Sequence, residues 1–181
     1  MPFSLDGRVA LVTGSSTGLG KAIAFGLARC GARVALNYYN NEERAAKTFS
    51  EFEAEGFEGL MLRADVSDEE SVNALCDEVA GKLGGIDILV VNATPDQPQM
   101  PIEEFTWKHF QTMIDFFIKS PYLLTRAVLP HMKEKRRGRI INITSEVFQR
   151  SIGNFSAYVS AKGGQIGFTR SMATELAPFN I

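Results

Sequence analysis

The chain alternates between short runs of consecutive apolar residues and longer stretches in which apolar and polar residues recur at helical spacing. Continuous apolar runs are typical of strands that are buried on both faces of a sheet. On this basis we predict five strands, at residues 8–13, 34–38, 59–63, 86–91 and 139–143.

The stretches between the strands carry the start and stop signals of helices. We predict helices from a glycine-rich turn to about residue 28 and over residues 41–54, 67–82, 102–133 and 156–176. Gly31 is placed to end the first of them. Ser67 and Glu70 stand in the register of a capping box for the third, and Gly84-Gly85 ends it. In the long fourth stretch we expect a bend at Pro121.

Strands that alternate with helices predict a parallel sheet covered by helices on both faces. The fold class that we expect is a doubly wound, Rossmann-like α/β sheet of five strands in the order 3-2-1-4-5. The 181 residues suit one domain with a real core, and the sequence contains no internal repeat or linker. We therefore expect a single domain over residues 1–181.

The bulk composition excludes several classes of protein. The chain is 45% hydrophobic and 22% charged with a formal net charge of −2, which is ordinary for a soluble globular protein. Its densest basic segment, residues 133–137, is more typical of a solvated helix end than of a nucleic-acid patch. No apolar run is long enough for a membrane span. We predict no nucleic-acid partner and no membrane partner.

Cysteine and histidine usage gives no sign of a metal site or a disulfide framework. Cys30 and Cys76 lie in helical stretches without the spacing of either, and His109 and His131 are isolated. Residues 1–7 lack the pattern of a signal peptide. We therefore predict no metal and a reducing, cytoplasmic location.

The most suggestive chemistry lies between residues 140 and 162. Tyr158 and Lys162 are four residues apart in the last predicted helix, so both side chains fall on one helical face. A neighbouring ammonium favours the phenolate form of a tyrosine, which can then exchange a proton with an alcohol or a ketone. Ser145 follows the fifth predicted strand, at the edge where parallel sheets bind ligands. A tyrosine and a lysine four residues apart also occur often by chance, so the functional role of this pair depends on the rest of the chain.

The glycine-rich turn after the first strand is a candidate phosphate cradle. Gly14, Gly18 and Gly20 join a strand to a helix, where the backbone can approach a pyrophosphate at a helix N-terminus. A nucleoside-triphosphate loop is excluded, because five residues separate Gly14 from Gly20 and Lys21 is followed by Ala22. A purely structural glycine turn is the alternative.

Several motifs in order give the chain a resemblance to a known family. They are Thr13-Gly14-x3-Gly18-Leu19-Gly20, Ala64-Asp65-Val66, Ile86-Asp87-Ile88-Leu89-Val90 with Asn92-Ala93, Ser145, and Tyr158-x3-Lys162. In this combination the chain resembles the short-chain dehydrogenase/reductases of the single-domain type, over nearly all of its length. Among them it looks similar to 3-oxoacyl-thioester reductases and bacterial glucose dehydrogenases.

The resemblance implies an NAD(P)-dependent oxidoreductase that interconverts a carbonyl and a secondary alcohol by hydride transfer. Tyr158 would be the general acid or base, Lys162 would tune it and hold the nicotinamide ribose, and Ser145 would orient the substrate oxygen. The implied cofactor-binding residues are Gly14, Ser16, Thr17, Gly18, Leu19, Gly20, Asn37, Tyr38, Asp65, Val66, Asn92, Ala93, Tyr158 and Lys162. Two of them have plain alternatives, since Asp65 could only cap the following helix and Asn92 could only be a turn residue.

Cofactor choice in such folds is set at the end of the second strand, where an acid favours NAD and a base favours NADP. This chain has Asn37-Tyr38-Tyr39-Asn40-Asn41 there, which is neither. Asn-Tyr before an acidic helix resembles members that lean towards NADP or accept both cofactors, although Thr17 stands where NADP-preferring members often carry Arg. We predict NADP in preference to NAD.

The predicted partner is a small carbonyl or alcohol substrate, whose class the sequence leaves open. Its pocket should be lined by residues 94–99, Glu146, Phe148, Asn154 and Phe155. In the family the two long helices pair between subunits, which implies a homodimer or homotetramer. Packing of both helices on their own sheet is the alternative.

Three departures from the family's pattern change this picture. Thr94 stands where the family has glycine, and Phe117 stands where it often has an Asn that holds a proton-relay water. The chain ends at Ile181 without the family's sixth and seventh strands, so we expect a C-terminally truncated domain with an exposed sheet edge.

Phe117 and the missing strands favour a rival function, a catalytically weak dinucleotide-binding protein that acts as a sensor or partner subunit. The intact catalytic residues favour the enzyme.

Overall fold

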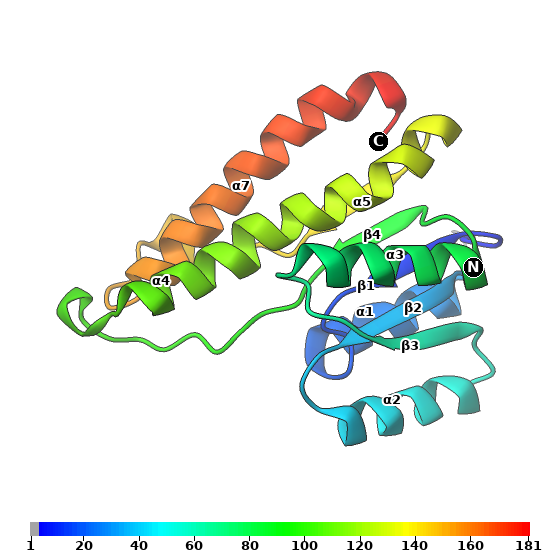
Figure 1. Ribbon diagram of the computed structural model, residues 1–181, viewed down its shortest axis with the longest axis horizontal. Helices are drawn as coiled ribbons and strands as arrows, with labels where there is room; N and C mark the ends of the chain where they lie inside the picture. The colour runs from blue at the N-terminus through cyan, green and yellow to red at the C-terminus, as the bar shows by residue number, and fades with distance from the viewer. Residues whose placement is uncertain (1–3) are drawn as a thin grey trace.

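The computed structural model describes residues 4–181. The prediction that residues 1–7 lack a signal-peptide pattern therefore falls partly on residues that lie outside the described part. A five-stranded parallel sheet in the order β3-β2-β1-β4-β5 forms its centre (Figure 1). The strands are β1 Val9–Val12, β2 Arg33–Tyr38, β3 Gly59–Arg63, β4 Ile88–Val91 and β5 Arg139–Asn142. The predicted fold class and strand order are confirmed.

Helices cover both faces of this sheet (Figure 1). They are α1 Gly18–Arg29, α2 Glu42–Ala54, α3 Glu69–Leu83, α4 Trp107–Ile114, α5 Ser120–Lys135, α6 Val147–Arg150 and α7 Ser156–Leu176, with the short turns η1 Ile102–Glu104, η2 Asp115–Lys119 and η3 Ala177–Phe179. The core on one face includes α1 and α2, and the core on the other includes α3 and α5. No helix in the described part of the chain combines the length and the apolar character needed to cross a bilayer.

The two cores are separate because successive residues of a strand point to opposite sides of the sheet. In β1, Val9 and Leu11 join the core that contains α3 and α5, while Ala10 and Val12 join the core that contains α1 and α2. All four side chains are buried. A central strand that is apolar at every position therefore follows from the need to fill both cores.

The start of α3 differs from the predicted capping box. Asp68 is the N-cap residue, and its side chain accepts a hydrogen bond from the N–H of Ser71. The N–H and the hydroxyl of Ser67 both donate instead to Oδ1 of Asp65, at 2.8 and 2.6 Å. The predicted pairing of Ser67 with Glu70 is therefore wrong, whereas the predicted helix end at Gly84, which has φ +100, is confirmed.

The predicted long helix over residues 102–133 is interrupted. Residues 102–104 form one 3₁₀ turn, α4 begins after the N-cap Thr106, and residues 115–119 form a π-helical turn that leads into α5. Pro121 lies in the first turn of α5, and it has no N–H to bond the carbonyl of Phe117 four residues earlier. The departure from α-helical geometry thus precedes Pro121, and it includes Phe117.

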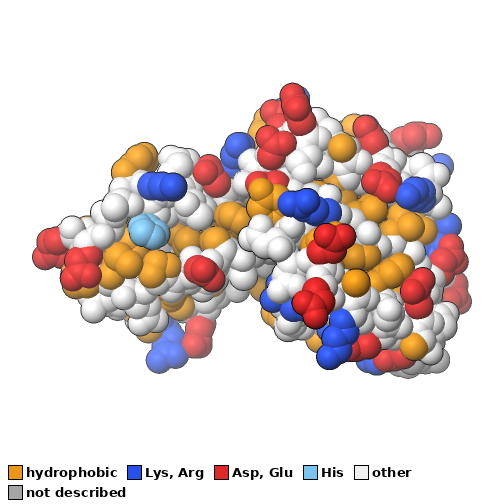
Figure 2. Space-filling model, turned by 60° about the horizontal axis from the view of Figure 1, so that its bottom comes forward, with side chains coloured by type: hydrophobic (Ala, Val, Ile, Leu, Met, Phe, Trp, Pro, Cys, Tyr) orange, Lys and Arg blue, Asp and Glu red, His pale blue; other side chains and the backbone are white. Residues whose placement is uncertain are grey.

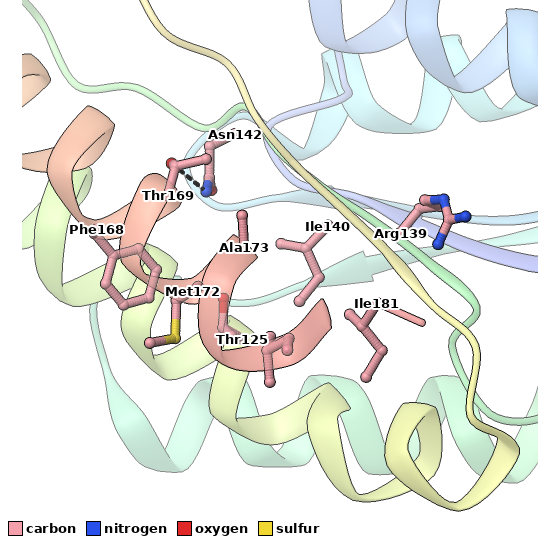
Figure 3. A pocket seen from close by; sticks show the side chains of 10 residues that line it. Thr125, Arg139, Ile140, Asn142, Phe168, Thr169, Met172, Ala173 and Ile181 are labelled. Carbon is pink, nitrogen blue, oxygen red and sulfur yellow. Dashed lines mark hydrogen bonds between the residues drawn. The ribbon is translucent and has the colours of Figure 1, made fainter. Parts of the chain in front are cut away.

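Strand β5 forms one edge of the sheet and leaves Ile141 45% exposed, in line with the exposed edge that the sequence predicts. A pocket of about 160 Å³ lies between β5, α5 and α7 and is lined mainly by apolar side chains (Figure 3). It also receives the buried hydroxyl of Thr125 and the side chain of Asn142. Neither Oγ1 of Thr125 nor Oδ1 of Asn142 has a hydrogen-bond partner within residues 4–181.

Candidate active site

A crevice opens at the carboxyl ends of β1 to β4 and has a volume of about 530 Å³. The strand order reverses there, between β1 and β4, which is where doubly wound sheets bind their ligands. Nine of the predicted cofactor-binding residues line it: Gly14, Ser16, Thr17, Asn37, Tyr38, Asp65, Val66, Asn92 and Ala93.

The glycine turn between β1 and α1 combines close packing with open access. Gly14 has φ +63, and a Cβ there would lie 2.7 Å from Cα of Ala93. A Cβ on Gly20 would lie 2.5 Å from Nδ2 of Asn92. A Cβ on Gly18, which has φ +55, would meet nothing within 4 Å, so the start of α1 is open to an approaching group. The turn therefore fits a pyrophosphate, which the positive end of the α1 dipole attracts.

Asn92, just after β4, locks this turn to the sheet. Its Nδ2 donates to the backbone oxygens of Thr13 and Gly14, at 3.0 and 3.1 Å. The hydroxyl of Thr13 accepts in return from the N–H groups of Asn92 and Ala93, at 3.0 and 3.1 Å. Asn92 is thus more than a turn residue, because it fixes the glycine turn at the edge of the crevice.

Asn37, at the end of β2, links three strands. Its side-chain oxygen accepts from the N–H of Gly14 at 3.2 Å, and its Nδ2 donates to the backbone oxygen of Ala64 at 3.1 Å. The residue is 2% exposed. Asn37 therefore lines the crevice, but its amide holds the glycine turn, β2 and the end of β3 together.

Asp65 follows β3 and lines the crevice, and only one of its two carboxylate oxygens is hydrogen-bonded in the described structure. Oδ1 accepts both hydrogen bonds from Ser67, whereas Oδ2 has no hydrogen bond within residues 4–181. Asp65 does not cap α3, because Asp68 does. Next to it, Val66 is buried and lines the same crevice.

Tyr158 and Lys162 both lie in α7, as predicted. The ring of Tyr158 packs against the rings of Phe117 and Phe155, with centroid distances of 5.2 and 4.7 Å. Nζ of Lys162 lies 5.7 Å from the centroid of the Tyr158 ring and 4.0 Å from that of Phe117. Phe117 thus lies against the predicted catalytic lysine and cannot hydrogen-bond it.

Burial lowers the pKa of Lys162 from 10.5 to about 8. The side chain is 4% exposed, and taking an ammonium out of water disfavours its charged form. Its hydrogen bonds go to the backbone oxygen of Ile143 at 2.5 Å and to Oε1 of Gln165 at 2.9 Å. Sequence analysis did not identify Gln165, because nothing in its local pattern distinguishes it from a surface glutamine.

Ser145 lies between β5 and α6, beyond the carboxyl end of β5. Its Oγ accepts one long hydrogen bond, at 3.4 Å, from the N–H of Val147. No hydrogen bond joins Ser145 to Tyr158 in the described part of the chain. The hydroxyl hydrogen of Ser145 is therefore free to turn towards a ligand.

A second cavity, of about 660 Å³, adjoins the crevice and is lined by Pro95, Asp96, Gln97, Pro98, His109, Thr112 and Met113. Its neighbourhood, formed by α4 and the loop before it, carries apolar side chains on its surface (Figure 2), and Trp107 is 70% exposed. Residues 95–98 of the predicted substrate pocket line this cavity. Glu146 and Phe148 do not line it, and Phe155 is buried against Tyr158.

The chain belongs to the short-chain dehydrogenase family. The family's sequence model, described as short chain dehydrogenase, matches residues 8–181. The 2-dehydro-3-deoxy-D-gluconate 5-dehydrogenase of Formosa agariphila is 34% identical over 99% of this chain and 67% of its own length. The 3-oxoacyl-[acyl-carrier-protein] reductase FabG of Vibrio cholerae is 40% identical over 96% of this chain and 69% of its own.

Solved structures give the same assignment. A gluconate 5-dehydrogenase from Burkholderia cenocepacia, in complex with NADP and tartrate, is 35% identical with a TM-score of 0.90, covering 99% of this chain and 69% of that one. A 7α-hydroxysteroid dehydrogenase, complexed with NADH and 7-oxo glycochenodeoxycholic acid, is 31% identical with a TM-score of 0.92, covering 98% and 69%.

Membership of the short-chain dehydrogenases makes this chain an NAD(P)-dependent oxidoreductase that uses a nicotinamide dinucleotide. It spans about two thirds of the length of the relatives named above. The part that it spans contains the crevice, the glycine turn, Ser145, Tyr158 and Lys162.

Proposed function

We propose that this protein interconverts a carbonyl and a secondary alcohol, with Tyr158 as the general acid in reduction and the general base in oxidation. The observation that carries the proposal is the Lys162 ammonium 5.7 Å from the centre of the Tyr158 ring. A cation at that distance stabilises the negative charge that Tyr158 gains when it releases its proton. When bound, a nicotinamide dinucleotide supplies the hydride for reduction and accepts it in oxidation.

In reduction, Tyr158 donates its hydroxyl proton to the substrate oxygen, which becomes the hydroxyl of the product. Ser145 donates a hydrogen bond to the same oxygen, orients it and stabilises the charge that develops on it. In oxidation the Tyr158 phenolate takes the proton back from the alcohol. Lys162 keeps that phenolate stable in both directions.

Different residues of the crevice would contact different parts of the cofactor. The turn from Gly14 to Gly20 and the N-terminus of α1 would hold the pyrophosphate. The Oδ2 oxygen of Asp65 would accept a hydrogen bond from the adenine amino group, and Val66 would hold the adenine on its apolar side. Support for this comes from the open space above Gly18 and from the missing partner of Oδ2 in the described structure.

NADP is the preferred cofactor in this proposal, because the crevice offers an unpaired cation near the end of β2. Arg44 lies in the first turn of α2 and lines the crevice. Its guanidinium has no hydrogen bond or ion pair within residues 4–181. Glu42 and Glu43 precede it in α2 but do not line the crevice. A free guanidinium in this place fits the 2′-phosphate that distinguishes NADP from NAD.

The proposal is tested by following cofactor oxidation with a panel of aldehydes, ketones and keto acids. At least one carbonyl should be reduced, and Tyr158→Phe should lower the rate by about 10²-fold or more while fluorescence titration shows cofactor binding unchanged. A variant as active as the wild type would contradict the role of Tyr158. A chain that binds the dinucleotide but reduces nothing would instead support the dinucleotide-binding sensor or partner subunit.

A further inference from the structure

Lys162 has few ways to satisfy its buried ammonium. Nζ can donate three hydrogen bonds, and two go to the backbone oxygen of Ile143 and to Oε1 of Gln165. The face of the Phe117 ring lies on another side, 4.0 Å away, and offers a cation–π contact only. Of these partners, Gln165 supplies the only side-chain hydrogen-bond acceptor.

Gln165 is itself held firmly in place. It follows Lys162 by three residues in α7, so the two side chains share one helical face, and it is 1% exposed. Its backbone oxygen accepts from the hydroxyl of Thr169 at 2.7 Å, and that hydroxyl accepts from Asn142 of β5 at 2.9 Å. Because an ammonium only donates, the carbonyl end of the Gln165 amide must face it.

The acidic groups on the π-helical turn and on the segment before α6 are engaged elsewhere. Asp115, on the π-helical turn η2, accepts a hydrogen bond from Gln111. Glu146, between β5 and α6, pairs with Arg150. Burial is accordingly the cause of the lowered pKa of Lys162, with no carboxylate within the described residues to offset it.

Tyr158 is a titratable neighbour of Lys162 on the same face of α7, and its proposed proton transfer needs the ammonium. A buried ammonium that lacks acceptors becomes neutral or moves towards water. Either change would remove the positive charge from beside Tyr158. The reaction therefore depends on whatever keeps Lys162 both charged and in position.

We propose that Gln165 is a positioning residue for the reaction, whose amide oxygen holds the Lys162 ammonium, charged, beside Tyr158. The inference rests on the proposed role of Tyr158 in proton transfer. Phe117 makes the role of Gln165 necessary, because it covers the ammonium with a ring that accepts no conventional hydrogen bond. Phe117 and Gln165 then act together, one excluding water and the other replacing it as an acceptor.

The direct test is an NMR titration of Lys162 in protein with ¹³C-labelled lysine, which needs neither cofactor nor substrate. The Lys162 signal is assigned by its loss in Lys162→Arg. In Gln165→Met, which keeps the size of the side chain but not the amide oxygen, the Lys162 midpoint should fall by about one pH unit or more. In Gln165→Glu, which adds a negative charge, the midpoint should rise.

The control is Gln149→Met, which replaces an exposed glutamine of α6 and should leave the Lys162 midpoint unchanged. Midpoints that are the same in wild type and both Gln165 variants would overturn the proposal. If Gln165→Met does not fold, as judged by circular dichroism, the direction of the shift in Gln165→Glu decides.

A second readout separates positioning from a merely structural role. With an active carbonyl substrate, the pH profile of kcat should move in the same direction as the Lys162 midpoint in each variant. A midpoint that shifts without moving the profile would overturn the proposal. If the wild type reduces no carbonyl, the proposed function fails while the titration still shows whether Gln165 holds the ammonium.

Discussion

At the scale of single residues, most polar side chains around the crevice form hydrogen bonds within the protein, and few remain available to a ligand. Asn37 and Asn92 use their amides to fix the glycine turn, and Thr13 accepts two backbone hydrogen bonds in the same place. These bonds satisfy buried groups that would otherwise destabilise the fold. The groups left over for a ligand are Oδ2 of Asp65, the hydroxyl of Ser145 and the guanidinium of Arg44.

Arg44 offers a test of cofactor preference at this scale. Arg44→Gln should weaken the binding of NADP by about 10- to 100-fold and leave NAD unaffected, because it removes a charge-assisted hydrogen bond to the 2′-phosphate only. Fluorescence titration with each cofactor measures this. The matched control is Arg170→Gln, since Arg170 is also unpaired within residues 4–181 but lies on α7, away from the crevice. Equal losses for both cofactors in Arg44→Gln would contradict the assignment.

Lys162 should make stability depend on pH in the alkaline range. Its pKa is about 8 in the folded protein and 10.5 ordinarily, so between these values the unfolded chain binds a proton that the folded chain lacks. The free energy of unfolding should therefore rise with pH across this window. Urea unfolding near pH 7.5 and pH 10 should show the wild type gaining ~2 kcal/mol relative to Lys162→Met. Parallel pH profiles of the two proteins would refute this.

At the scale of elements, the glycine turn and the π-helical turn η2 set the positions of the site. The first brings the start of α1 beside the carboxyl ends of β1 and β4, because Gly14 and Gly20 allow contacts that a Cβ would block. The second carries Phe117 to the face of α7 that bears Tyr158 and Lys162. Irregular backbone at these two places thus supports the two halves of the site.

Gly14 tests the first of these elements. Gly14→Ala should destabilise the protein by about 1–3 kcal/mol and weaken dinucleotide binding, because alanine must adopt positive φ and its Cβ meets the backbone of Ala93. Thermal unfolding and fluorescence titration measure the two effects. Gly26→Ala is the control, since Gly26 lies within α1 with open space around it and should gain about 0.5–1 kcal/mol. A Gly14→Ala variant with wild-type stability would contradict this prediction, because the turn would then accommodate the Cβ without cost.

At the scale of the whole molecule, the strand order decides where the site forms. Segments that are far apart in the sequence, after β1, β2, β3 and β4, meet at one edge of the sheet and enclose the crevice. Tyr158 and Lys162, the proposed catalytic residues, lie on α7, which packs on α4 and η2. The crevice is thus built from the N-terminal half of the chain and Phe116, and no residue of α7 lines it in the described structure.

Ligand binding should accordingly stabilise the whole fold. NADP at about 100 times its Kd should add ~2.7 kcal/mol to the free energy of unfolding, because it binds the folded state alone. For a chain of this size, differential scanning fluorimetry should then report a rise in Tm of roughly 5–10 °C. Gly14→Ala should show a smaller rise at the same NADP concentration. An unchanged Tm in the wild type would argue against a site for the dinucleotide in this crevice.

Local patterns in the sequence were enough to find the strands, the glycine turn and the pair of Tyr158 and Lys162. Each of these rests on the spacing of neighbouring residues, which the chain carries without reference to distant segments. The errors arose where a neighbour changed a local preference. Ser67 looked like a helix cap, but Asp65 holds it and Asp68 caps α3 instead.

The sequence by itself determined the strands, the fold class and the family, because the apolar runs, the glycine turn and the other motifs each lie in consecutive residues. Only the tertiary structure decided that Arg44 faces the crevice, that Phe117 covers Lys162 and that Gln165 holds its ammonium. These relations depend on which segments meet in space and on which polar groups burial leaves in need of a partner.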